Sequence, residues 1–165
     1  MISSPVTVWY GIVGLLLLLI QMQADFIAVE QITPDLIVLF VIYLAVREGQ
    51  FVGLLAGFAM GLLFDLVSSD INGLNALAKM LAGFAAGFFY REEASLQEAV
   101  GTPRFLWITA GASLLHNIVY YFFYVRPSQL EFLPFFLRYG LAFTLYTTVF
   151  SLVVMLVVAR KRVDA

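Results

Sequence analysis

The chain has 165 residues, of which 62% are hydrophobic and only 12% are charged, and its mean hydropathy is +0.97. A soluble domain contains about 45–50% apolar residues, so this composition is typical of an integral membrane protein. The net charge of −2 provides no basic surface for nucleic acid, and the lack of cysteine excludes disulfides, thiolate metal sites and thiol catalysis.

Six apolar segments predict an all-α integral membrane protein, a six-transmembrane-helix bundle that forms a single domain over residues 1–165. The first segment lacks a basic start and a small-residue cleavage site, so we expect it to remain as a membrane helix. The second is short for a crossing and would have to thin the bilayer, start in the headgroup layer or be shielded by neighbours. The expected spans are 5–22, 34–46, 51–67, 74–90, 105–125 and 132–159.

The second span has a clear start signal at Thr33, Pro34 and Asp35. The threonine can cap the helix, proline suits its first position, and the carboxylate complements the positive end of the helix dipole. We therefore expect a helix that begins here and ends before Gly49.

The third and fourth spans carry rows of glycine at four-residue intervals, separated by turn-forming residues 68–73. The glycines of the two rows are Gly53, Gly57, Gly61, Gly83 and Gly87. A chain that reverses symmetrically about Asn72 would bring Gly61 to Gly83 and Gly57 to Gly87. We expect a close helix hairpin, because small residues let helix backbones approach each other in lipid. Ordinary transmembrane packing explains such glycines as well as any special function does.

The same symmetry brings Asp65 opposite Lys79 and predicts an intramembrane ion pair. Two alternatives stay open. Lys79 could extend alone to the interface, and Asp65 could cap the outer turn or contact a partner protein. A proton relay would need a chain of acids across the bilayer, and the sequence has none.

The fifth and sixth spans carry polar residues at helical spacing, namely Ser113, His116, Asn117, Thr144 and Thr147. Reversal of the chain about Leu130 would bring Ser113 to Thr147 and His116 to Thr144. Two interpretations remain: a packed interface in which the hydroxyls hydrogen-bond across helices, or a polar cavity for a small ligand.

The sequence does not favour an enzyme. His116 is the only histidine, and Ser113 lies one turn away on the same helix rather than converging on it. No paired intramembrane carboxylates or metal-ligand clusters accompany it, and we expect neither catalytic residues nor a metal or cofactor. The loops are short, so the protein must act through its membrane body.

Positive charges predict the orientation of the chain, because cytoplasmic loops are richer in Lys and Arg. If both termini are cytoplasmic, only two basic residues, Arg126 and Arg138, fall in outer loops. The inner segments then carry Arg47, Arg91, Arg104, Arg160, Lys161 and Arg162. We therefore expect both termini in the cytoplasm.

Several motifs follow one another between residues 34 and 87. They are Pro34-Asp35-Leu36, Arg47-Glu48-Gly49, the glycine row from Gly53 to Gly61, Asp65-Leu66 and Gly73-Leu74. In this order they resemble the MreD family of rod shape-determining inner-membrane proteins of bacteria. The length, the six spans and the basic C-terminal end agree over the rest of the chain.

The resemblance implies a non-enzymatic membrane scaffold of the cell-elongation machinery, which makes lateral peptidoglycan. The implied partners are MreC, RodA, MreB, a class B penicillin-binding protein and membrane lipids. MreC is a bitopic protein with a periplasmic coiled coil. The family is also similar in fold to the S-components of energy-coupling-factor transporters. That similarity keeps open an alternative, a subunit that binds a small vitamin-like molecule. An ion carrier is disfavoured by the missing relay.

Overall fold

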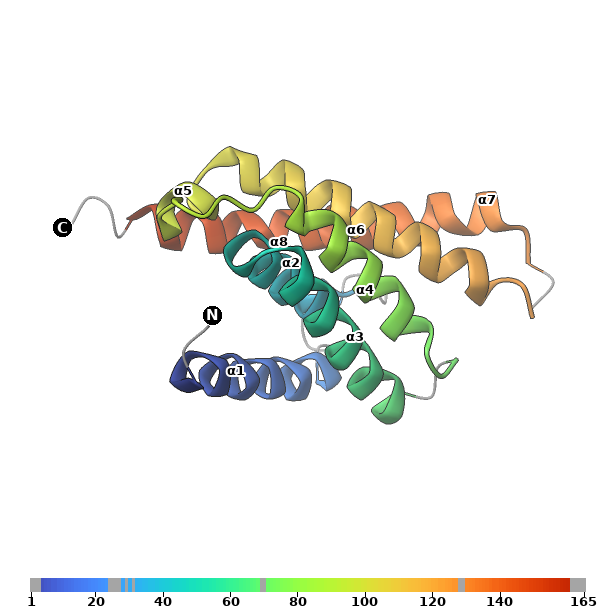
Figure 1. Ribbon diagram of the computed structural model, residues 1–165. Helices are drawn as coiled ribbons and strands as arrows, with labels where there is room; N and C mark the ends of the chain where they lie inside the picture. Colours follow the sequence, from blue (N-terminus) through green and yellow to red (C-terminus); the bar gives the residue numbers. More distant parts are fainter. Residues whose placement is uncertain are drawn as a thin grey trace.

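The computed structural model describes residues 4–23, 28, 30, 32–68, 71–127 and 130–160, and helices account for most of them (Figure 1). No β-strand occurs in this part of the chain. In order, the helices are α1 (Ser4–Met22), α2 (Leu36–Glu48), α3 (Gln50–Val67), α4 (Leu74–Gly87), α5 (Leu96–Ala99), α6 (Pro103–Tyr124), α7 (Phe132–Phe135), the π-helix η2 (Phe136–Gly140) and α8 (Leu141–Arg160).

Each of the six predicted spans coincides with helical structure. Three helical segments are long and apolar enough to cross a membrane: α3, α6 and the continuous run Phe132–Arg160. The apolar helices Val6–Met22 and Leu74–Gly87 are shorter, and α2 has only 13 residues. Six crossings therefore stay a prediction.

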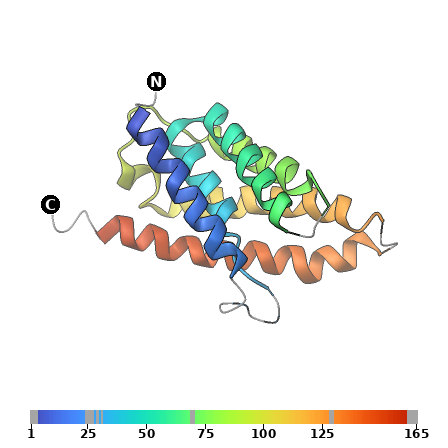
Figure 2. The same cartoon turned by 90° about the horizontal axis from the view of Figure 1, so that it is seen from below.

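The connections gather at two ends of the molecule. The N-terminal end of α1, the C-terminal end of α8 and helix α5 lie at one end, whereas the α3–α4 turn and α7 lie at the other (Figures 1 and 2). This grouping agrees with the relative sides expected from the basic residues. The cytoplasmic assignment stays a prediction, and Lys161 and Arg162 lie outside the described residues.

Helix α2 forms the centre of the core. Its side chains pack against α4, α6 and the loop before α6, and almost all of them are buried. The main core residues are Val38, Leu39, Ile42, Ala45, Val46, Ala82, Ala86, Val100, Phe105, Ile108 and Ala112. Of the three ways that a helix this short could be accommodated, shielding by neighbours is the one the structure has.

The glycine rows lie between α3 and α4, but the expected register is wrong. A Cβ on Gly57 would overlap the carbonyl of Lys79, and one on Gly83 would overlap the carbonyl of Gly53. A Cβ on Gly61 would lie 2.5 Å from the Cα of Ala76. The hairpin is thus shifted by about two helical turns from symmetry about Asn72. The Asp65 carboxylate bonds the N–H groups of Asn75 and Ala76, and this contact holds the first turn of α4 beside the last turns of α3.

The last predicted span is not one uniform helix. The chain passes from α7 through η2 into α8, and the backbone N–H of Leu141 bonds the carbonyl of Phe136 five residues earlier. The ring of Phe136 leaves no room for a Cβ at Gly140, and the hydroxyl of Thr144 donates to the Gly140 carbonyl at 2.8 Å. Glycine and the threonine hydroxyl thus accommodate the wider turn.

Candidate functional site

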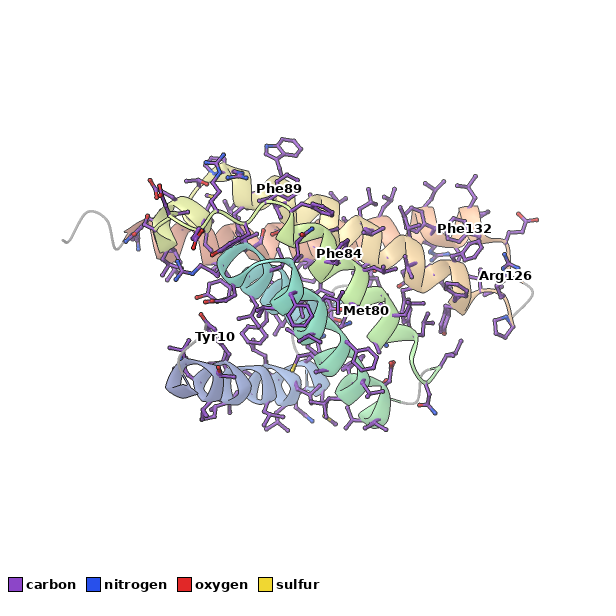
Figure 3. The ribbon with its side chains drawn as sticks, in the orientation of Figure 1. Tyr10, Met80, Phe84, Phe89, Arg126 and Phe132 are labelled. Atoms are coloured by element: carbon purple, nitrogen blue, oxygen red, sulfur yellow. The ribbon has the colours of Figure 1, made fainter. Side chains whose placement is uncertain are left out.

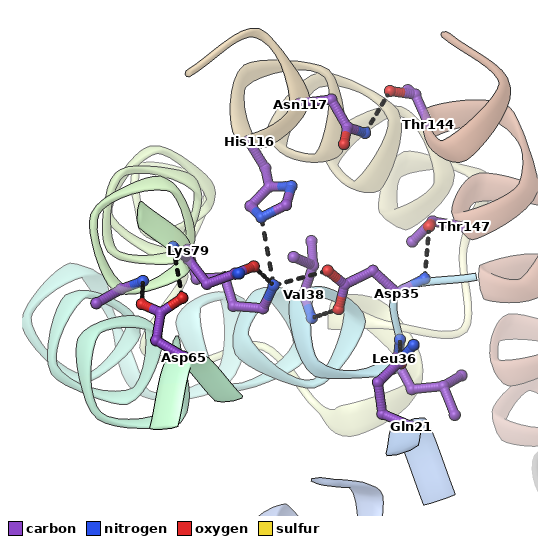
Figure 4. A network of polar contacts seen from close by, with 12 residues as sticks. Gln21, Asp35, Leu36, Val38, Asp65, Lys79, His116, Asn117, Thr144 and Thr147 are labelled. Atoms are coloured by element: carbon purple, nitrogen blue, oxygen red, sulfur yellow. Dashed lines mark hydrogen bonds and ion pairs between the residues drawn. The ribbon is translucent and has the colours of Figure 1, made fainter. Parts of the chain in front are cut away.

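The N-terminus of α2 lies inside the molecule, so its free backbone N–H groups need protein partners. The Asp35 carboxylate caps the helix by accepting from the Val38 N–H at 2.8 Å. The Asp35 N–H donates to the Thr147 hydroxyl at 3.0 Å, and the Leu36 N–H donates to the Gln21 side-chain oxygen at 2.8 Å. Residues from α1, α2 and α8 are thereby fixed around one point (Figure 4).

Lys79 of α4 points at the same place and is 1% exposed. Its ammonium group donates to Asp35 Oδ2 at 2.8 Å and to Asn75 Oδ1 at 2.9 Å, and lies 3.3 Å from His116 Nε2 (Figure 4). An ammonium has three N–H donors, so each can be used in one of these contacts. The lysine therefore links α2, α4 and α6 through these three contacts.

The expected ion pair between Asp65 and Lys79 is wrong. The Asp65 carboxylate instead accepts from the backbone N–H groups of Asn75 at 3.1 Å and Ala76 at 3.0 Å. These are the first-turn N–H groups of α4, whose N-cap Gly73 has no side chain to offer. Asp65 thus supplies the missing cap from the neighbouring helix. Its burial, at 1% exposed, also leaves no surface for a partner contact.

The polar residues of α6 and α8 meet with partly different partners from those expected. Thr144 accepts from the Asn117 amide at 2.9 Å rather than meeting His116, and Thr147 accepts from Asp35 rather than meeting Ser113. The Ser113 hydroxyl has no hydrogen-bond partner among the described residues. The register expected between these helices is therefore nearly right, whereas the individual hydrogen bonds are not.

The motif residues that suggested the family lie at structurally demanding positions. Pro34 is buried next to the Asp35 cap. Gly49 and Gly73 have φ angles of +96° and +87°, in the region that favours glycine. Gly49 lets α2 end and α3 begin at the next residue, and Gly73 ends the connection into α4.

An apolar groove lies between α1 and α8, beside α2 and α6. It has a volume of about 320 Å³. Tyr10, one of its lining residues, extends from α1 (Figure 3) and donates a 2.8 Å hydrogen bond to Glu48 at the end of α2. The lining residues are Trp9, Tyr10, Val13, Leu17, Leu36, Leu39, Phe40, Tyr43, Phe105, Phe150 and Val154. Helix α1 packs mainly on α2 and α3, and its residues face those of α8 across the groove.

Sequence reasoning missed two features of this region. The cap of α2 was expected at Thr33, with Asp35 only complementing the helix dipole, whereas Asp35 is itself the N-cap and also the counter-ion of Lys79. Gln21 was not expected to have a role. The pairing of Asp35 with Lys79 could have been suspected from chemistry but not from residue spacing, because a lysine in an apolar span requires an acid within reach of its side chain. Gln21 gave no such signal.

Comparison with known proteins supports the resemblance. The sequence profile of the family described as rod shape-determining protein MreD matches residues 4–161, nearly the whole chain. Searches of curated proteins and of solved structures gave no match.

Proposed function

Because the chain belongs to the MreD family of rod shape-determining inner-membrane proteins, we propose that it is a non-enzymatic scaffold of the cell-elongation machinery. In this role it binds MreC through its transmembrane bundle and supports lateral peptidoglycan synthesis. The observation that carries the proposal is the family match over residues 4–161. We propose RodA, MreB and a class B penicillin-binding protein as further partners in the same assembly.

The apolar groove beside α1 supports a transmembrane partner. Lipid tails are as apolar as side chains, so helices in a membrane associate through shape and close packing rather than through hydrophobicity. A groove between two helices provides such a shape, and this one is lined by aromatic and aliphatic side chains from α1, α2, α6 and α8. We propose that the transmembrane helix of MreC packs over this groove and inserts side chains into it.

Neighbouring residues on α1 allow a matched test. Val13 lines the groove, whereas Ile12 is 46% exposed on the outer side of the same helix. Val13→Trp should fill the groove and lower the amount of MreC recovered with the protein from detergent-solubilised membranes by about tenfold or more. Ile12→Trp should leave recovery close to that of the unmodified chain.

The outcomes separate the two parts of the proposal. If the unmodified chain recovers no MreC, the scaffold function is contradicted. If it recovers MreC and the two tryptophan variants behave alike, the groove is not the binding surface. Thermal unfolding of both variants in the same detergent provides the control for folding.

A further inference from the structure

A second, polar cavity lies beside Lys79, on the other side of the α2 N-terminus from the apolar groove. Its volume is about 180 Å³, room for about six water molecules at ~30 Å³ each. Its lining residues are Gln21, Thr33, Asp35, Phe64, Asn75, His116, Asn117, Tyr120, Tyr121 and Phe143. Two of the residues expected to form a polar cavity, His116 and Asn117, lie on its wall, whereas Ser113, Thr144 and Thr147 do not line it.

Two of the residues that line this wall carry side-chain amides whose oxygens are bound to the protein. The oxygen of Asn75 accepts from Lys79, and the oxygen of Gln21 accepts from the Leu36 N–H, whereas these bonds do not use the NH₂ group of either amide. Asn75 is 3% exposed, and its NH₂ nitrogen is buried with no hydrogen-bond partner among the described residues. A buried donor without a partner is destabilising, and a ligand that accepts from it would offset that cost.

The charge and shape of the wall further restrict the class of ligand that the cavity could bind. Asp35 lines the cavity and is paired with the ammonium group of Lys79 behind the wall, so its carboxylate already has a counter-ion and the site does not call for a cation. The imidazole of His116 stacks on Tyr120 with a ring separation of 6.0 Å and an interplanar angle of 15°. Together with Phe64 and Phe143, these rings give a wall suited to a small flat group.

We propose that this cavity binds a small uncharged molecule, or an uncharged part of a lipid, through a carbonyl oxygen that accepts from the amides of Asn75 and Gln21. The site does not depend on MreC, and it lies apart from the groove over which we place that partner. A free amide and a lipid ester share the carbonyl chemistry, so the test must distinguish these sources.

The chain contains one histidine, which lies on the wall of this cavity and reports on it alone. The protein is labelled with ¹⁵N-histidine, purified in detergent with a histidine-free affinity tag, and titrated with the cyclic amide 2-pyrrolidone. We expect a saturable shift of the His116 imidazole nitrogen signals. Asn75→Asp keeps an oxygen for Lys79 but removes the NH₂ donor, and should weaken the apparent affinity about tenfold or more.

Two further variants keep the test decisive. Gln21→Glu likewise retains its oxygen for Leu36 while losing its NH₂, so it should weaken the response even if Asn75→Asp does not fold. Asn72→Asp makes the same chemical change in the exposed α3–α4 turn and should leave the response intact.

Reconstitution into nanodiscs of phosphatidylethanolamine and phosphatidylglycerol separates the two sources. If the natural ligand is a lipid ester, the histidine signals shift on reconstitution and 2-pyrrolidone adds nothing. If it is a free molecule, the nanodisc sample responds to 2-pyrrolidone as the detergent sample does. No shift under either condition, or an undiminished shift when both donors are removed, overturns the proposal.

Discussion

Lys79 is the residue on which the buried polar network depends. A charged side chain at the centre of a membrane helix costs about 2.5–3.5 kcal/mol on insertion scales, so it requires compensation. The lysine finds this in a carboxylate from the cap of α2, an amide from its own helix and an imidazole from α6. One ion thereby links three helices that are far apart in the sequence.

The pairing predicts a measurable coupling between Asp35 and Lys79. Asp35→Asn preserves a good N-cap residue while removing the charge, and Lys79→Met removes the ammonium group but keeps a long apolar side chain. Each single change leaves one charge without its partner and should destabilise the protein, by up to about 3–5 kcal/mol for the fully buried lysine. The double variant should lose less than the sum of the singles, with a coupling of about 0.5–3 kcal/mol.

Reversible unfolding in mixed micelles measures these free energies. The control is the same cycle with Asp65→Asn, because the Asp65 carboxylate bonds backbone N–H groups of α4 rather than Lys79. A stronger coupling of Lys79 to Asp65 than to Asp35 would refute the network.

The sequence alone could show that Lys79 needs an acid but not which acid. Symmetry about the turn favoured Asp65, fourteen residues away, whereas the actual partner lies 44 residues away in sequence. A contact over that separation depends on how α2 enters the bundle, and no local pattern encodes this. The start of α2 is a local feature and was predicted to within two residues, but the cap was expected at Thr33 rather than at Asp35.

At the scale of the elements, the close contact of α3 with α4 rests on their glycines. Gly57 lies directly against the backbone of Lys79, so even a methyl group would overlap the carbonyl there. Gly111 of α6 provides a contrast, because a Cβ on it would meet nothing within 4 Å. The two positions therefore separate a packing glycine from a glycine that merely occupies a helix.

We expect Gly57→Ala to destabilise the protein and Gly111→Ala to be neutral or stabilising. Overpacking at a tight contact costs about 1–3 kcal/mol, whereas alanine in an unobstructed helix gains up to about 1 kcal/mol over glycine. Thermal unfolding of the two variants in one detergent tests this. Equal shifts of the melting temperature would mean that Gly57 does not lie at a helix–helix contact.

The helices themselves were predictable because apolar runs bounded by turn residues mark them, and every expected span contains helical structure. The registers between neighbouring helices were less predictable. The α3–α4 register depends on the bonds of Asp65 to the first turn of α4, and the π-helix at Phe136–Gly140 depends on a ring that occupies the space beside Gly140. Both are tertiary effects, which neither hydropathy nor residue spacing reports.

For the whole molecule, the grouping of connections at two ends gives a topology that labelling can test. The chain lacks cysteine, so single cysteines can be introduced without other changes. The α3–α4 connection and α7 lie at one end and α5 at the other (Figure 1). Exposed residues beside these elements are Asn72 in the α3–α4 connection, Pro127 between α6 and α7, and Ser95 at the start of α5. With cytoplasmic termini, an impermeant thiol reagent should label Asn72→Cys and Pro127→Cys on intact cells but not Ser95→Cys.

Permeabilised cells provide the control, since all three cysteines should then react. Labelling confined to Ser95→Cys on intact cells would reverse the orientation. Labelling of only one of the first two positions would mean that the helix order across the membrane differs from the two-ended grouping.

The scaffold proposal is tested most directly by photo-crosslinking in the native membrane. A photoreactive amino acid replaces Leu17, which lines the apolar groove, and in a second variant it replaces Val153, which is 54% exposed on α8 and does not line the groove. The account predicts an adduct with the transmembrane segment of MreC from position 17 and none from position 153. An adduct from position 153 alone would contradict the groove as the binding surface. The absence of any MreC adduct from either position, in cells that contain MreC, would contradict the central claim that this protein binds MreC through its transmembrane bundle.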